Sequence, residues 1–492
     1  SHSGNYTKYW DTDMQIYKFP AYTTVSIEET KAPANYVTSG NFQYGDTSIK
    51  GVKLIGWFKP ANDGTHSRFY IGNKSNGNTI SDSFEASAEA ITLYETPKRY
   101  NLRFTKRDLE SGEAMANVAF KITSDKGEEH VVVTDANGVF DSAARSGDKW
   151  STKASNYDAN KTSYTAENLW FYGAANDKIS EDASVDSTLG SVPAGTYTIE
   201  EIRCDANEGY QLEPAFTINV SSKSENGATI AYNKNNGTVY NALNPKIVSD
   251  ATEFLNAGKD QVIKDKVTCS YLTYKKSYTV TGVIVGDDAK AIKNSDGKWI
   301  TATKTFTTGA APANYKSIHE AVQNLEMSYT VDASDLGGKK THVFVYLLDG
   351  TGNLSIANDG TITVSALAED ADVNNADQTT SYRMMETDAI NVKSGNQLIN
   401  ATDNEDVKDT VNMQGLEPNT AFTLKGRIVT KDEEVLGTGE TPFTSGDKGV
   451  ETQSVLFTGL KLSELAGKDI VVYEELWCGD QKIMEHCDVN DA

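Results

Sequence analysis

Three residues that lie far apart in the chain, Lys106, Glu201 and Asn241, carry the groups needed for a covalent bond between side chains. Burial disfavours charge, so a buried lysine shifts toward its neutral amine and a buried glutamic acid toward its protonated form. A neutral Lys106 amine could then attack the side-chain carbonyl of Asn241, while Glu201 polarises that carbonyl and transfers the proton. Ammonia would leave and an uncharged isopeptide bond would remain. The plainer alternative is a surface lysine, a solvated strand-end acid and a turn asparagine.

Each of the three residues lies in an expected β-strand. The strands are predicted over Tyr100–Asp108, Tyr197–Glu201 and Thr238–Ala242. Short alternating stretches of this kind, separated by Gly, Asn and Asp turns, recur along the whole chain. Helix-like stretches are few, with Ser317–Leu325 and Ser463–Ala466 as the candidates. The sequence therefore predicts an all-β fold.

Length and composition restrict the class of protein. The 492 residues are too many for one core and indicate about three to five domains. A net charge of −23 argues against binding to nucleic acid or anionic lipid. No apolar run reaches the roughly 18 residues of a membrane span. The four cysteines and six histidines show no metal-ligand spacing, so we expect free thiols, no metal and no cofactor.

Internal repeats divide the chain. The segment Val25–Tyr36 resembles Tyr197–Tyr210, and six short segments between Ser249 and Asn375 recur in the same order between Thr387 and Asp491. The repeats predict four β-domains, at residues 1–97, 98–245, 246–380 and 381–492, with a polar insertion at 141–190. Very short linkers would hold such tandem domains in an elongated rod.

The insertion carries Trp150, Trp170 and Tyr172. These aromatic side chains would form either an exposed binding patch or a small satellite core. The sequence leaves both alternatives open.

The second domain resembles the collagen-adhesin B-type (CnaB) fold of Gram-positive surface proteins. The resemblance is carried by Phe104-x-Lys106-x-Asp108, Ala119-Phe120-x-Ile122, Thr134-Asp-Ala-Asn-Gly138, Pro193-Ala-Gly-Thr-Tyr197-x-Ile-x-Glu201, Gly209-Tyr210 and Val239-x-Asn241. It implies an immunoglobulin-like β-sandwich in which Lys106 and Asn241 form an isopeptide bond, with Glu201 as the catalytic acid.

The first domain is similar to the second half of the same fold, and we interpret it as a truncated or divergent CnaB-like domain. Glu29 matches the acid position, but Glu95 stands where the asparagine is expected. The opening strand with its lysine has no convincing counterpart. We therefore expect no amide bond within residues 1–97.

The third and fourth domains resemble the Thr–Gln ester-bond (VaFE-type) domains of Gram-positive adhesin stalks. In that family a threonine hydroxyl attacks a glutamine side chain and expels ammonia, with a His, an Asp and a Glu as helpers. In the fourth domain, the resemblance makes Thr387 the nucleophile and Asp409, Glu474 and His486 the helpers. The acceptor glutamine is expected just beyond Asp491, where the sequence ends, so we expect this domain to be truncated at its C-terminus.

The third domain departs from the family in the opposite way. Gln378 stands at the acceptor position and Ser249 replaces the threonine. Of the helpers only Asp265 remains, because Asp370 replaces the histidine and Tyr346 is interpreted as replacing the glutamate. Two alternatives stay open for this degenerate domain, a Ser249–Gln378 ester or a β-sandwich held together by its core alone.

These features predict a structural stalk of an extracellular, cell-wall-associated adhesin, whose only chemistry is a single-turnover cross-linking of itself. Such a stalk would project a tip that binds a host-surface or matrix ligand through another part of the protein. With neither a signal peptide nor a sorting signal recognisable, we expect an excised ectodomain whose peptidoglycan anchor lies beyond the C-terminus given. The alternatives are a pilus shaft subunit, which needs a donor lysine and a sorting motif, and a carbohydrate-binding or hydrolytic β-sandwich, which needs carboxylates paired across a cleft.

Overall fold

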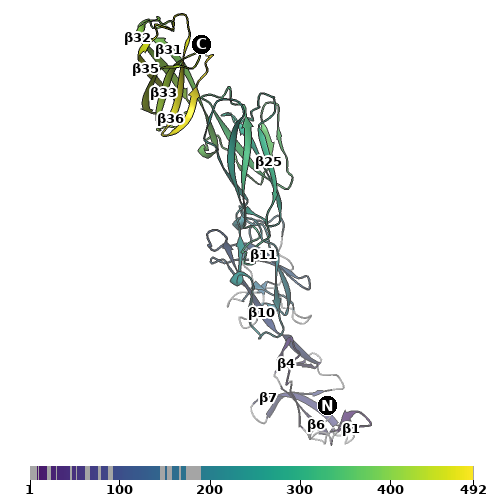
Figure 1. Cartoon of the computed structure of the whole chain (residues 1–492). Helices are drawn as coiled ribbons and strands as arrows, with labels where there is room; N and C mark the ends of the chain where they lie inside the picture. Colours follow the sequence, from purple (N-terminus) through teal and green to yellow (C-terminus); the bar gives the residue numbers. More distant parts are fainter. Residues whose placement is uncertain are drawn as a thin grey trace. The chain divides into compact units, whose positions relative to one another are not determined.

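A computed structural model of the chain describes residues 8, 10–18, 24–28, 30–44, 47–50, 53–60, 67–75, 79–86, 92–143, 150–151, 158–165, 168–172 and 190–490. These residues form β-strands joined by turns and short 3-10 helices, so the all-β prediction is confirmed. Within this part of the chain, no helix has the length and apolar character needed to traverse a membrane. The chain divides into two compact units, Ser1–Ala242 and Leu243–Ala492, each described below by itself (Figure 1).

The N-terminal part of the first unit contains small antiparallel sheets. One sheet has the strand order β3-β6-β7-β8, a second has the order β5-β4-β9, and β1 pairs with β2. The strand bounds are β1 (Trp10–Asp11), β2 (Ile16–Tyr17), β3 (Thr24–Glu28), β4 (Tyr36–Tyr44), β5 (Thr47–Lys50), β6 (Lys53–Pro60), β7 (Ser67–Ser75), β8 (Thr79–Ala86) and β9 (Thr92–Pro97). Glu29, the predicted acid of this segment, lies outside the described residues.

The remainder of the first unit is a sandwich of two sheets. In the first sheet β10 (Arg99–Asp108) pairs with β13 (Val139–Asp141), β16 (Val192–Pro193), β19 (Thr229–Ala231) and β20 (Thr238–Asn241). The second sheet has the order β12 (Glu129–Val133), β11 (Ala119–Ser124), β17 (Gly195–Glu201) and β18 (Phe216–Val220). Alternate residues of β17 are buried, as expected of a strand with one face on a core. Two short 3-10 helices, η2 (Asp205–Asn207) and η3 (Asn235–Gly237), connect strands.

Trp170 of the insertion packs into this sandwich instead of facing solvent. It is 3% exposed, and the guanidinium carbon of Arg99 lies 3.4 Å from the centre of its ring. Arg99 also donates hydrogen bonds to the backbone oxygens of Gly190, Phe171 and Ser191. These contacts favour the satellite-core alternative for Trp170. The insertion also contributes β14 (Trp150–Ser151), which pairs with β15 (Asn168–Leu169).

The second unit contains the two repeats, each a sandwich with its own apolar core. The third domain is built from β21 (Lys246–Ala251), β22 (Phe254–Asn256), β23 (Gln261–Leu272), β24 (Ser277–Val285), β25 (Thr301–Thr307), β26 (Ala321–Val331), β27 (Lys340–Asp349), β28 (Leu354–Ile356), β29 (Ile362–Val364), β30 (Ala368–Asp370) and the 3-10 helix η4 (Ala376–Gln378). The fourth is built from β32 (Asp403–Gln414), β33 (Ala421–Thr430), β34 (Val435–Thr444), β35 (Glu451–Lys461), β36 (Ile470–Cys478) and β37 (Gln481–His486), several of them labelled in Figure 1.

One strand, β31 (Thr379–Asn391), belongs to both repeats. Its first residues pair with β22 and β27, and its residues from Met384 onward pair with β32. The boundary expected between residues 380 and 381 therefore falls inside a single strand. The four-domain division itself stays a prediction.

Both helix predictions are wrong. Residues Ala321–Val331 form strand β26, in which buried or half-buried residues alternate with exposed ones. The segment Ser463–Ala466 is a turn between β35 and β36. The helix prediction for Ser317–Leu325 fails because residues 317–320 form a turn and the segment from Ala321 onward pairs with β23, which outweighs local helix preference.

Candidate cross-linking sites

Lys106 and Asn241 come from adjacent parallel strands of one sheet. Register pairs Lys106 with Val239 and Asp108 with Asn241 on β10 and β20. Both side chains are fully buried. The Lys106 amine contacts the Asn241 side-chain oxygen, so the nucleophile and the carbonyl predicted to react with it are adjacent. Burial lowers the pKa of Lys106, against the opposing effect of Glu201, and this favours the neutral amine that the reaction needs.

Glu201 reaches the same point from the opposite sheet, at the end of β17. One carboxyl oxygen, Oε2, lies 3.1 Å from the Lys106 amine nitrogen. The other, Oε1, accepts a hydrogen bond from the Asn241 amide nitrogen at 2.5 Å. One carboxyl group therefore contacts both the attacking amine and the nitrogen that would leave. The structure thus brings together all three residues that the sequence singled out.

Asn207, in η2, holds Glu201 in this orientation and was missed by the sequence analysis. It is fully buried, and its side-chain nitrogen donates to Glu201 Oε1 at 3.0 Å and to the Ile202 carbonyl at 2.9 Å. Its side-chain oxygen accepts from the Cys204 backbone N–H. An available signal was the Ala-Asn pair that both copies of the first repeat share, Ala34-Asn35 and Ala206-Asn207.

In the third domain the structure brings Ser249 and Gln378 together. The amide nitrogen of Gln378 donates to the Ser249 hydroxyl oxygen at 3.1 Å and to the Asp370 backbone oxygen at 2.7 Å. The Asp370 carboxylate accepts from the Ser249 backbone N–H at 3.0 Å. Gln378 is fully buried and Ser249 is 6% exposed. The predicted nucleophile and acceptor are therefore in contact and shielded from water.

Asp265 lies beside this pair. Ser249 and Asp265 are diagonal neighbours on paired strands, because register places Ala251 opposite Asp265. Burial raises the pKa of Asp265 to about 7, although the Ser249 hydroxyl opposes the rise. Neither carboxyl oxygen has a hydrogen-bond partner of good geometry among the described residues. Asp265 is therefore placed to accept the hydroxyl proton of Ser249.

The interpretation that Tyr346 replaces the family's glutamate is wrong by one residue. In the fourth domain Glu474 pairs with Gly426, and in the third domain the equivalent Gly282 pairs with Val345. A one-residue shift along a strand moves a side chain to the other face of the sheet. Val345 accordingly faces the main core, whereas Tyr346 packs in a separate cluster. Valine, not tyrosine, stands at the glutamate position.

In the fourth domain Asp409 and Glu474 form a buried acid pair. Both are fully buried, and burial raises the pKa of each carboxyl. Nearby Asp409 raises the pKa of Glu474 further, whereas the adjacent Glu474 carboxyl lowers that of Asp409. Glu474 is therefore the member of the pair that tends to hold a proton, although no oxygen of either carboxyl has a hydrogen-bond partner of good geometry among the described residues. His486 lies opposite Glu474 in register, and its positive form lowers the pKa of Asp409.

Thr387 occupies the position in the fourth domain that Ser249 has in the third. It is a diagonal neighbour of Asp409, because Ala389 pairs with Asp409. Thr387 is half-buried and lines a groove together with Ile470, Val471 and other residues of β31 and β36. Register thus places Thr387 beside Asp409 and His486 beside Glu474.

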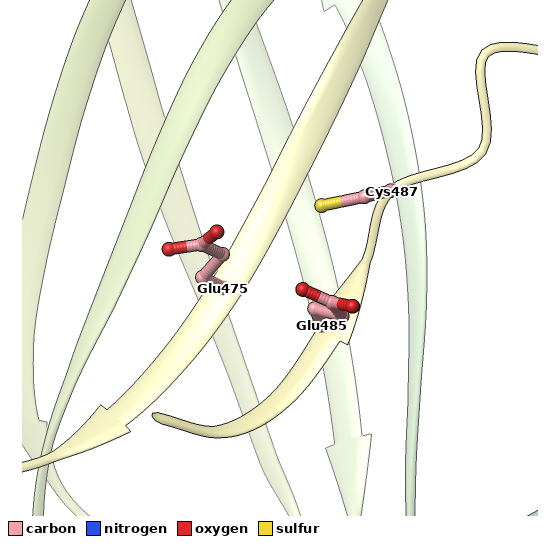
Figure 2. A group of neighbouring side chains, drawn as sticks. All are labelled: Glu475, Glu485 and Cys487. Carbon is pink, nitrogen blue, oxygen red and sulfur yellow. The ribbon is translucent and has the colours of Figure 1, made fainter. Parts of the chain in front are cut away.

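The part of the chain that the structure describes holds one cluster with the spacing of a metal site, formed by Glu475, Glu485 and Cys487 (Figure 2). These groups project from β36, β37 and the residue after it. Lys482 lies 3.6 Å from Glu475 and 2.5 Å from Glu485, and Arg427 lies 3.3 Å from Glu475. Because these cations already compensate the carboxylates, we assign no metal here.

Two protein families match different parts of the chain. The T-Q ester bond containing domain matches residues 228–381 and 383–492, together more than half of the chain. The prealbumin-like fold domain, SpaA, matches residues 100–238. No curated protein matches the chain.

Similar solved structures include three bacterial proteins. A bacterial adhesin from Mobiluncus mulieris containing intramolecular disulfide, isopeptide and ester bond cross-links is 15% identical over 47% of this chain and 80% of that chain, with a TM-score of 0.22. BcpA, the major pilin subunit of Bacillus cereus, is 12% identical over 77% of this chain and 87% of that chain, with a TM-score of 0.29. The Bacillus anthracis TIE protein is 10% identical over 92% of this chain and 62% of that chain, with a TM-score of 0.25.

Proposed function

Because the chain belongs to the family of proteins with T-Q ester bond containing domains, we propose that it is a self-cross-linking stalk segment of a bacterial surface adhesin. Its chemistry is performed once, on its own side chains, and not on an outside substrate. The observation that carries the proposal is the buried contact of Lys106, Glu201 and Asn241, in which the three groups of one reaction meet in a core.

In the second domain the Lys106 amine nitrogen attacks the side-chain carbon of Asn241. The new bond joins Lys106 Nζ to Asn241 Cγ, and the bond from Cγ to Nδ2 breaks. Glu201 takes a proton from the amine through Oε2 and delivers one to the departing nitrogen through Oε1, so it ends as it began. Ammonia leaves, and the core loses a buried lysine amine that is costly to charge.

In the third domain the Ser249 hydroxyl attacks the Gln378 side chain and ammonia leaves in the same way, giving an ester. Asp265 accepts the hydroxyl proton. In the fourth domain we assign Thr387 as the nucleophile and Asp409, Glu474 and His486 as its helpers. The proposal there covers only these four residues.

The proposed role follows from where the bonds lie. The isopeptide joins β10 to β20, the first and last strands of the second domain, so a pulling force cannot peel these strands apart without breaking a covalent bond. Resistance to force then depends on bond rupture instead of on the folding equilibrium. We place the protein outside the cell, on the cell wall, where it holds a ligand-binding tip away from the surface.

The test is intact mass followed by peptide mapping of the full chain. We expect a mass deficit of one ammonia from a peptide pair containing Lys106 and Asn241, and another from a pair containing Ser249 and Gln378. Hydroxylamine should cleave the second link and leave the first intact, because it attacks esters much faster than amides. A chain of full calculated mass would refute the proposal. Turnover of a glycan by the purified protein would instead revive a hydrolytic function.

A further inference from the structure

The third domain lacks the glutamic acid that pairs with the buried aspartate in the fourth. Glu474 lies beside Asp409 there and lowers its pKa, but Val345 stands at the equivalent position in the third domain. Asp265 therefore has a fully buried valine at the position where Asp409 has a second carboxyl group. A buried carboxyl without a hydrogen-bond donor is costly, so an explanation is needed for its presence.

A second substitution in the same core supplies a hydroxyl group. Tyr329 of β26 is 1% exposed and pairs with Ile263, and in the fourth domain Phe457 pairs with the equivalent Val407. The third domain thus has tyrosine and valine where the fourth has phenylalanine and glutamate. Relative to the fourth domain, the third domain therefore lacks a carboxyl group on β27 and has an additional hydroxyl group on β26.

The two polar groups occupy the same place, above a glycine that both domains keep. A Cβ atom added to Gly426 would lie 2.5 Å from Glu474 Oε1 and 2.7 Å from the tip of the Phe457 ring. A Cβ atom added to Gly282 would overlap the Tyr329 hydroxyl oxygen. The Tyr329 hydroxyl therefore fills the space that the Glu474 carboxyl fills in the fourth domain.

The Tyr329 hydroxyl and both oxygens of Asp265 have no hydrogen-bond partner among the described residues. Burial raises the pKa of the Tyr329 hydroxyl, and the charge of Asp265 raises it further, which keeps the phenol neutral and able to donate. These three buried polar atoms of one core thus lack hydrogen-bond partners, and a small shift of the phenol or one buried water would join the hydroxyl to the carboxyl.

We propose that Tyr329 replaces the missing glutamate as the hydrogen-bond donor to Asp265, and so positions Asp265 for the Ser249–Gln378 cross-link. This inference rests on the proposed ester in the third domain. In that step the Ser249 Oγ–Gln378 Cδ bond forms, the Gln378 Cδ–Nε2 bond breaks, and the hydroxyl proton passes by way of Asp265 to the departing ammonia. Tyr329 touches neither reacting atom. It stabilises the ionised aspartate that takes the proton, which makes it a positioning residue.

The experiment follows cross-link formation in full-length chains made by cell-free synthesis and quenched at increasing times, with mass mapping of the peptides containing Ser249 and Gln378. We expect Tyr329→Phe to slow formation on the order of a hundredfold, the scale of losing a group that assists proton transfer. Adding Val345→Glu to Tyr329→Phe recreates the residues of the fourth domain and should restore most of the rate. Tyr278→Phe removes another buried phenol of this domain and should leave the rate unchanged.

The outcomes separate the two proposals. A wild-type chain without the Ser249–Gln378 link would refute the ester in this domain and the role of Tyr329 with it. A linked wild-type chain whose Tyr329→Phe variant reacts at the same rate would refute only the role of Tyr329. The role of Tyr329 would also be refuted if Tyr329→Phe slowed cross-link formation and adding Val345→Glu did not restore the rate, since the hydroxyl would then act through packing. Circular dichroism melting of each variant establishes that it is folded when its rate is compared.

Discussion

Replacing Lys106 by methionine tests the central reaction with little disturbance of the core. Methionine has a similar length, fills the same apolar space and introduces no buried charge. The variant lacks the nucleophile, so no isopeptide bond can form. Glu201 keeps its hydrogen bonds from Asn207 and Asn241. The loss of stability should therefore come mainly from the missing cross-link.

The size of that loss follows from the loop that the bond closes. Lys106 and Asn241 are 135 positions apart in the chain. Closing a loop of this length removes entropy from the unfolded chain that corresponds to about 5 kcal/mol at 25 °C. For a domain of about 150 residues each kcal/mol shifts the melting temperature by roughly 2–4 °C. We therefore expect one unfolding transition to fall by about 10–20 °C.

Differential scanning calorimetry of the full chain measures the transition, and intact mass reports the bond. Lys121→Met is the matched control, since Lys121 lies on β11 of the opposite sheet and pairs with surface Glu200 at 2.9 Å. A pair at the surface contributes little, so the control should stay within about 1 kcal/mol of wild type. The reasoning is refuted if Lys106→Met and Lys121→Met melt alike, or if the wild-type chain shows no ammonia loss while Lys106→Met still melts lower.

Three further changes probe the surroundings of the bonds. Asn207→Ala should slow isopeptide formation about tenfold, the effect of one hydrogen bond to a charged group, because Glu201 loses a donor; a time course of the mass deficit checks this, and an unchanged rate would contradict it. Asp265 has a pKa of about 7 against an ordinary 3.8, so the folded domain binds its proton more tightly than the unfolded chain. The protonated Asp265 carboxyl therefore stabilises the folded domain by on the order of 4 kcal/mol below pH 4, and this stabilisation is lost as the pH rises to 7. Denaturant titrations at several pH values should show this fall in the free energy of unfolding in wild type and not in Asp265→Asn. Gly282→Ala should destabilise the third domain by about 2 kcal/mol or more, because the added Cβ would overlap the Tyr329 hydroxyl. If calorimetry finds the variant as stable as wild type, the Tyr329 side chain can move to make room and the prediction is wrong.

Much of the isopeptide site could be predicted because its parts are local. Alternation of apolar and polar residues places Lys106, Glu201 and Asn241 on strands, and the repeated segment around Glu201 marks that residue among many acids. Asn207 was missed because it acts from a 3-10 turn, where no periodic pattern exists. Trp170 was ambiguous for a similar reason, since only the packing of Arg99 against its ring decides that it is buried.

In the ester-type domains, the repeat aligned Ser249 with Thr387 and Asp265 with Asp409, and the family resemblance indicated the roles of these residues and of Gln378. It could not settle which residue of β27 corresponds to Glu474, because neighbouring residues of a strand differ by one position in sequence and by a whole face of the sheet in space.

The order of residues thus determined the all-β class and the repeats, since each depends on local alternation or on matching segments, and it indicated the candidate cross-linking side chains. Only the tertiary structure decided which groups meet in the cores. Register between strands far apart in sequence puts Val345 at the position that Glu474 has in the fourth domain. Side-chain packing across the sandwich places the Tyr329 hydroxyl against Gly282. Contacts of that kind join residues dozens of positions apart, and no pattern within a single strand encodes them.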